Sequence, residues 1–293
     1  MKELREKYKQ LKPLIKDKFW GKYFDGNQFQ LHLISALSKS YEFNRFVNKK
    51  TKKKLSFFAS PTLRGICEDF IVLKFLKKHK TLDSNKILNN YMQIQLHDIV
   101  SKQSKFFKKN HPQQIVLTDE KFEGIEQLSN DLKDEWAKIG MNKEKIFPSI
   151  SHMATDAGLV ELYEFLYSAT SDMVHFSPHV LMRSGWSKTE DKYLHHFSTK
   201  NFSKYYDLYN KFYGSYLFCL FVKEFKKDLE IDKNAIKLVD EIKEIILSES
   251  RWPELVTFEE MNIPNAEKIR MINAIRKISQ LITHDDGRTT SIS

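Results

Sequence analysis

Along most of the chain, apolar residues recur at steps of three and four with polar residues between them, which is the pattern of amphipathic helices. This pattern predicts helices over residues 1–22, 28–46, 60–76, 84–109, 119–138, 157–176, 201–227, 233–250 and 265–284. Only nine glycines and seven prolines supply turn signals in 293 residues, which favours long helices joined by short loops over many strands. The predicted fold class is therefore all-α, a helical bundle with additional N- and C-terminal helices.

Local signals refine three of these helices. Ser60 before Pro61 and Asp83 before Ser84 are predicted N-caps. In the helix at 84–109, Leu96 and Ile99 are expected to face the core. The aromatic residues of 201–227 are interpreted as core, with a surface for stacking bases as the alternative.

The stretch from Ala157 to Pro178 carries the most informative pattern. One face of the predicted helix is apolar and should pack against the core; its members are Leu159, Leu162, Tyr163, Leu166, Thr170 and Val174. A neighbouring stripe at the same spacing is polar and consists of Glu164, Ser168, Ser171 and His175.

Polar groups beside a core need partners. Arg64 and Glu68 lie four residues apart on another apolar helix, where a guanidinium and a carboxylate share one face. We therefore predict a polar cluster between these two helices. An ion pair that only fixes helix packing is the alternative interpretation of Arg64 and Glu68.

The predicted helices divide the chain into four parts. Residues 1–27 form a basic N-terminal arm, and residues 28–200 form a helical core domain that carries the candidate site. Residues 201–284 supply C-terminal helices packed on that core, and residues 285–293 form a tail expected to be disordered.

Composition places the chain among soluble, cytoplasmic proteins. Apolar residues make up 41% and charged residues 29%, which is ordinary for a globular protein. Cys67 and Cys219 both lie in apolar helical patterns, so we expect core residues of a reducing compartment and no disulfide. No stretch approaches the roughly 18 apolar residues of a membrane span, and the N-terminus lacks the apolar segment of a signal peptide.

The formal net charge of +10 allows attraction to polyanions such as RNA or DNA. The densest basic run, residues 48–54, includes Lys52, Lys53 and Lys54. This run is a candidate phosphate-binding loop, and a solvated surface loop is the simpler interpretation.

His175 and His179 suggest a metal site, because two histidines four residues apart on one helix can bind the same metal ion. Pro178 lies between them and disfavours helical geometry at Ser177. A helix that breaks near Phe176 does not place the two imidazoles on one face, so we expect neither a metal nor another cofactor. A metal-dependent hydrolase that uses both histidines remains an alternative.

Two segments together resemble a bacterial family known only as a domain of unknown function. They read LRGICEDFIVLKFL from Leu63 to Leu76 and LYEFLYSATSDMVHFSP from Leu162 to Pro178. That family pairs an Arg-x3-Glu helix with a later Tyr-x3-Ser-x3-His helix, and the matching positions here are Arg64, Glu68, Tyr167, Ser171 and His175. The resemblance spans about residues 60–183.

The family in turn resembles the HEPN superfamily of small helical bundles, which implies a HEPN-like core. Many HEPN proteins are metal-independent endoribonucleases of toxin–antitoxin and phage-defence systems, with an Arg-x4-to-6-His motif usually completed across a dimer. No arginine lies four to six residues before His175, so Arg64 has to supply the guanidinium from another helix. The resemblance implies RNA as substrate and a homodimer, an antitoxin or a defence-system protein as partner.

The chemistry implied for these residues can be stated. RNA cleavage without a metal needs an acid or base near neutral pH and a cation for the charged phosphorane. His175 suits the first role and Arg64 the second. Glu68 orients either one, and Ser171 completes the candidate catalytic set. The candidate substrate contacts are Tyr167, His179, Lys52, Lys53 and Lys54.

Two non-catalytic interpretations stay open. The same groups can form a self-satisfied network that only fixes helix packing. The protein can also be a helical module that binds nucleotide, nucleic acid or a partner protein without chemistry.

Overall fold

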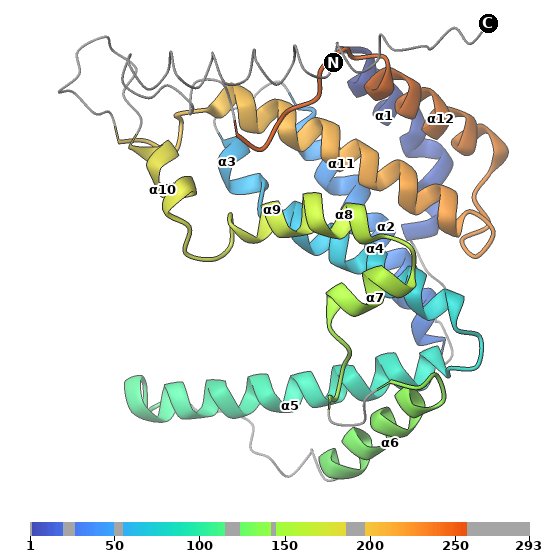
Figure 1. Ribbon diagram of the computed structural model, residues 1–293, viewed down its shortest axis with the longest axis vertical. Coiled ribbons are helices and arrows are strands. Elements are labelled where there is room, and N and C mark those ends of the chain that lie inside the picture. Colours follow the sequence, from blue (N-terminus) through green and yellow to red (C-terminus); the bar gives the residue numbers. More distant parts are fainter. Residues whose placement is uncertain are drawn as a thin grey trace, which may run out of the picture. The chain divides into compact units, whose positions relative to one another are not determined.

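A computed structural model describes residues 2–19, 27–49, 55–114, 124–141, 145–185 and 197–256 (Figure 1). Within these ranges every regular element is a helix, so the predicted all-α class is confirmed. The longer helices are α1 (Lys2–Ile15), α2 (Gln28–Val47), α4 (Thr62–Lys78), α5 (Ser84–Asn110), α6 (Ile125–Ala137), α11 (Ser203–Phe225) and α12 (Lys233–Leu247). The short ones are η1 (Lys16–Phe19), α3 (Ser56–Ala59), α7 (Ile150–Asp156), α8 (Val160–Leu162), η4 (Tyr163–Tyr167), α9 (Ser168–Ser171) and α10 (Pro178–Ser184).

Contacts divide the chain into a compact unit of residues 1–251 and a second unit of residues 252–293. Only residues 252–256 of the second unit are described, so the helix predicted at 265–284 and the tail predicted at 285–293 lie outside the described residues. None of the helices in the described ranges has the length and apolar character needed to cross a membrane.

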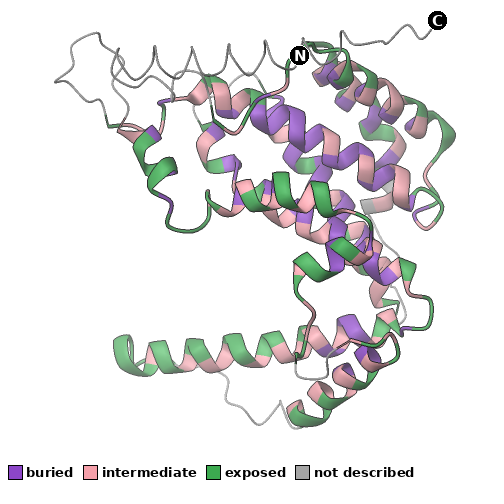
Figure 2. Ribbon diagram, in the orientation of Figure 1, coloured by how far each residue is buried: buried purple, intermediate pink, exposed green. Residues whose placement is uncertain are grey.

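Helix α11 is the central element of the first unit. It packs against α2, α3, α4 and α12, and α1 packs in turn on α12. Figure 2 shows buried residues along most of α11, in agreement with its fully buried aromatic side chains, among them Phe212, Phe218, Phe221 and Phe225. The interpretation of these aromatic residues as core, rather than as a surface for stacking bases, is confirmed.

Buried amide and hydroxyl groups hold α11 against its neighbours. Asn210 on α11 donates from Nδ2 to the carbonyl of Ser56 at 2.7 Å and accepts from Ser60 Oγ at 2.9 Å. Ser60 therefore joins α3 to α11. Its predicted role as the N-cap of α4 is wrong, because Pro61 occupies the cap position and no side chain caps the helix.

Helix α5 begins as predicted and is exposed where burial was expected. Asp83 caps it by accepting from the backbone N–H of Lys86 at 3.0 Å. Ile87 is buried, but Leu96 is 46% exposed and Ile99 55% exposed. Figure 2 shows the C-terminal half of α5 as mostly exposed. Helical spacing identifies an apolar face but not whether another element covers that face.

The helix predicted over 157–176 is shorter than expected and spans 160–171, where α8, the π-helical turn η4 and α9 follow one another without a gap. Helix α7 ends at Asp156, and the chain turns through Gly158 at a φ of +68°, a left-handed conformation that favours glycine. Helix α8, the π-helical turn η4 and α9 then follow, and α9 ends at Ser171. Of the predicted core face, Leu166 and Thr170 are buried, whereas Val174 lies beyond the helix and is 51% exposed.

Candidate functional site

Arg64 lies in the first turn of α4, on the border between the core and the surface. Its neighbours Leu63, Ile66 and Cys67 are buried, while Arg64 itself is half-buried. The side of α4 that faces the core therefore fixes the helix, and the guanidinium projects from its rim. A cation carried on an anchored helix is positioned without much loss of side-chain freedom.

The guanidinium of Arg64 joins two residues that lie more than a hundred positions later in the chain. Its Nη1 lies 2.6 Å from Nε2 of His175, and its Nη2 donates to the hydroxyl of Tyr167 at 2.9 Å. Its Cζ also lies 4.9 Å from the centroid of the Tyr167 ring. These contacts place Arg64, Tyr167 and His175 in one group, which we call the arginine cluster.

The π-helical turn and the end of α9 position the other two members. Tyr167 is the last residue of η4, and its ring stacks on that of Tyr163 with centroids 4.8 Å apart. Beyond α9, the carbonyl of Ser171 accepts from the backbone N–H groups of Val174 and His175, each at 3.0 Å. This turn brings His175 back towards α4, although His175 is no longer on the helix.

The contact between Arg64 and His175 specifies how the imidazole is protonated. A guanidinium has donors and no acceptor, so Nε2 of His175 has to accept at 2.6 Å. The ring in this arrangement is therefore neutral, with its proton on Nδ1. His175 is exposed, so solvent or a substrate can reach the ring.

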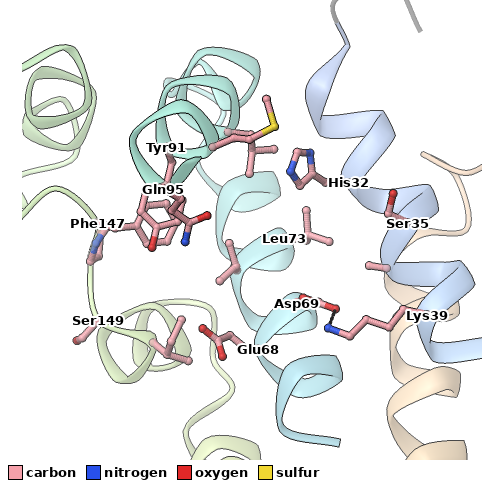
Figure 3. Close-up of a pocket in the computed structure, with 16 residues that line it drawn as sticks. His32, Ser35, Lys39, Glu68, Asp69, Leu73, Tyr91, Gln95, Phe147 and Ser149 are labelled. Carbon is pink, nitrogen blue, oxygen red and sulfur yellow. Dashed lines mark hydrogen bonds and ion pairs between the residues drawn. The ribbon is translucent and has the colours of Figure 1, made fainter. Parts of the chain in front are cut away.

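Glu68 lies one turn after Arg64 on α4 but faces a different space. It lines a cavity of about 560 Å³ formed with residues of α2, α5 and the segment that leads into α7, and Figure 3 shows it there with Asp69 and Ser149. Burial raises the pKa of the Glu68 carboxyl, and the nearby charge of Arg64 opposes part of that rise. No hydrogen bond joins Glu68 to the arginine cluster within the described residues.

The remaining predicted site residues take separate positions. Ser171 is half-buried and acts on His175 through its carbonyl. His179 is exposed in the first turn of α10, which begins at Pro178 after the N-cap residue Ser177. His175 and His179 therefore do not share a helical face. Lys52, Lys53 and Lys54 lie outside the described residues.

Two kinds of reactive group, a metal cluster and an ionised thiol, are not found in the described part of the chain. It contains no group of three or more His, Cys, Asp or Glu side chains able to hold a metal ion. Cys67 and Cys219 are free and buried, as predicted for core residues. Burial raises the pKa of each thiol to about 12, so neither supplies a thiolate near neutral pH.

Sequence reasoning missed the cavity beside Glu68. Its walls come from α2, α4, α5 and residues 147–150. They include His32 and Lys39 on α2 and Tyr91 on α5. The one available signal was the pair of aromatic residues Tyr91 and Phe147, whose rings stack with centroids 4.1 Å apart. Nothing in the helical periodicity of either segment indicates that the two meet.

The described residues define an all-helical protein in which α4 and the segment around α9 share a partly exposed cluster of arginine, histidine and tyrosine. Residues 29–193 match the family of unknown function DUF5677, and this match covers 165 of 293 residues, so the chain belongs to that family. The matched region includes the whole arginine cluster. No curated protein and no solved structure matches the chain.

Proposed function

We propose that the protein is a metal-independent endoribonuclease of the HEPN-like type that acts in phage defence or growth arrest. The observation that supports this most is the 2.6 Å contact between Arg64 and His175 on the protein surface. It joins a fixed cation to a neutral imidazole, the two groups that RNA cleavage without a metal requires. The net charge of +10 attracts the RNA backbone.

Substrate binding starts the reaction in this proposal. The planar guanidinium of Arg64 matches two phosphate oxygens, so a bound phosphodiester competes with His175 for its N–H groups. When Arg64 turns to the phosphate, the lone pair on Nε2 of His175 becomes free. Tyr167 keeps one edge of the guanidinium in place through its hydroxyl.

Nε2 of His175 then removes the proton of the ribose 2′-hydroxyl. The 2′-oxygen forms a bond to the adjacent phosphorus, and the bond from phosphorus to the 5′-oxygen breaks. The leaving 5′-oxygen takes a proton from water, and the hydroxide that remains takes the proton held by His175. The products are a 2′,3′-cyclic phosphate and a 5′-hydroxyl end. Arg64 stabilises the extra negative charge on the phosphorane.

The other predicted residues have supporting roles in this proposal. Ser171 holds the turn that positions His175, and its hydroxyl is available to a phosphate oxygen. Glu68 keeps a negative charge one turn from Arg64. His179 and the lysines Lys52, Lys53 and Lys54 contact the RNA backbone.

Purified wild type and His175→Ala, incubated with structured RNA in the presence of a chelator, test the proposal. Loss of general base catalysis lowers a rate by about 100-fold or more, so the variant should leave RNA intact. Because His175 is exposed, the melting temperature should stay unchanged. His152→Ala is the matched control, since His152 is exposed on α7 outside the cluster. Equal cleavage by wild type and His175→Ala would refute the proposed base.

A non-catalytic helical module that binds nucleotide, nucleic acid or a partner protein is the second candidate. In this case the mutual hydrogen bonds of the arginine cluster only fix helix packing. A network that only joins α4 to the segment around α9 predicts a different result in the same experiment. His175→Ala would then lower the melting temperature, and neither protein would cleave RNA. Growth and total RNA integrity in bacteria that express each protein give a second readout.

A further inference from the structure

The cavity beside Glu68 has the size of a small-ligand site. Its volume of about 560 Å³ falls within the roughly 300–1,000 Å³ of typical ligand pockets. Its wall includes the apolar residues Leu73 and Leu88 and the charged residues Glu68, Asp69 and Lys39. Figure 3 shows Glu68, Asp69, Lys39 and Leu73 among the residues that line it.

Among the charged groups in this wall, Glu68 alone lacks a partner within the described residues. Lys39 and Asp69 form an ion pair of 2.9 Å, and Nδ1 of His32 donates to the carbonyl of Gln28 at 2.7 Å. Glu68 makes no hydrogen bond and no ion pair there, although it is half-buried. A carboxylate that is partly removed from water without protein donors is unfavourable, and a ligand with N–H groups lowers that penalty.

An aromatic wall faces the same space. The rings of Tyr91 and Phe147 are nearly parallel, with centroids 4.1 Å apart and an interplanar angle of 21°. The ring of Trp136 packs edge-on against that of Phe147, with centroids 5.4 Å apart. This contact with a buried side chain holds Phe147 in place. A rigid aromatic surface favours a flat ligand, because π-faces stack offset on one another.

We propose that this cavity binds a planar group with two adjacent N–H donors, which pair with the two oxygens of Glu68. Two sources share this chemistry. A guanine base presents its N1–H beside its N2 amino group, and a guanidinium compound presents two parallel N–H groups. Adenine and cytosine each place a ring acceptor beside the amino group, and uracil flanks its N–H with carbonyls, so these bases fit a carboxylate poorly.

Calorimetric titration of the full chain tests this with two matched ligand pairs. Inosine is guanosine without the N2 amino group, and putrescine is agmatine with an amine in place of the guanidinium. We expect guanosine or agmatine to bind, with its matched partner at least about tenfold weaker, since one hydrogen bond to a charged group contributes about 1.5–3 kcal/mol. Binding of guanosine alone identifies a nucleobase site, and binding of agmatine alone identifies a site for guanidinium compounds.

Glu68→Gln replaces one acceptor oxygen with a donor at the same shape, and should weaken binding by at least about tenfold. Glu161→Gln on α8 is the matched control, because Glu161 is exposed and does not line the cavity. The proposal is overturned if neither guanosine nor agmatine binds, or if Glu68→Gln binds them as tightly as the wild type. The titration involves no RNA cleavage, so its outcome is independent of the proposed ribonuclease activity.

Discussion

Nη1 of Arg64 lies 2.6 Å from Nε2 of His175, although 111 positions separate the two residues. Each is held from its own side of the contact. Arg64 is fixed by the buried residues that flank it on α4, and His175 follows a turn closed by the carbonyl of Ser171. The buried Thr170 donates to the carbonyl of Leu166 at 2.6 Å, which anchors the end of α9 next to that turn.

Arg64→Lys should remove most of the activity and little of the stability. The guanidinium contacts His175 through Nη1 and Tyr167 through Nη2. A lysine has a single nitrogen and cannot make both contacts in this geometry. We expect RNA cleavage to fall by about 100-fold or more, because an arginine fork and a lysine are not interchangeable at a two-point contact. The change in unfolding free energy should stay below about 1 kcal/mol, as is usual for exposed polar contacts.

Tyr167→Phe provides the graded comparison. It keeps the ring that lies 4.9 Å from Arg64 Cζ and removes only the hydroxyl at 2.9 Å. Losing one hydrogen bond to a charged group should lower cleavage by about 10- to 100-fold. If Arg64→Lys cleaves as fast as wild type in single-turnover assays, the guanidinium does not stabilise the transition state.

Helical spacing predicted that Arg64 and His175 would lie in one polar cluster, but not that Tyr167 would join them or that Glu68 would face elsewhere. Helical spacing placed polar groups on two apolar segments, and buried polar groups require partners. The break at Gly158 and the π-helical turn that ends at Tyr167 depend on packing between segments. The spacing of apolar residues within one segment carries no information on that packing. The exposure of Ile99 could not be predicted for the same reason. The spacing identified the apolar face of α5 but not whether another helix packs on it.

The cap of α5 illustrates what local chemistry can specify. Asp83 accepts from an N–H group three residues later, a short-range interaction that depends on neighbouring residues only. Ser60 offered the same signal and instead donates to Asn210, 150 positions away. Local rules therefore predicted most helices, whereas the cavity beside Glu68 required knowledge of which helices meet.

Glu68→Gln should stabilise the protein at neutral pH while it weakens ligand binding. Burial raises the pKa of Glu68 in the folded state, which means that folding favours the protonated carboxyl. The stability that this preference contributes is complete below the unfolded pKa of about 4.3. It is lost as the pH rises through the folded pKa. The advantage of the glutamine variant should therefore be absent near pH 4 and grow towards pH 7. Urea unfolding of both proteins across this range measures it, and a pH-independent difference would contradict the expected titration.

Asp156→Asn should show the opposite dependence on pH. Burial alone would raise the pKa of Asp156, but hydrogen bonds from Lys78 and His79 outweigh it and lower the pKa. The ionised carboxylate therefore adds stability above its unfolded pKa of about 3.9, and this is lost as the pH falls through the folded value. The variant should be less stable than wild type at pH 7, by about 1 kcal/mol for so exposed a pair. Thermal melts should converge below about pH 4, and a gap that stays constant would contradict the assignment.

Gly214→Ala should destabilise the protein because α11 packs closely against α2 at this position. A methyl group at Gly214 would lie 2.6 Å from Phe43 Cε1 and 3.0 Å from Asn44 Oδ1. Asn44 is also fixed, since its Nδ2 donates to the carbonyl of Gly214 at 2.9 Å. We expect a loss of about 1–3 kcal/mol from overpacking, although alanine is favoured over glycine within a helix by about 1 kcal/mol.

Gly65→Ala on α4 is the matched control for this substitution. A methyl group there would meet only the end of the Lys39 side chain, with Nζ at 2.9 Å, and a flexible lysine can turn aside. The gain in helix propensity of about 1 kcal/mol should then offset any weakening of the exposed ion pair between Lys39 and Asp69. Urea unfolding should therefore show a lower unfolding free energy for Gly214→Ala. The unfolding free energy of Gly65→Ala should equal or exceed that of the wild type. If Gly214→Ala and Gly65→Ala have the same unfolding free energy, then α2 and α11 can move apart at no cost in stability. Asn44 would then not hold the two helices together.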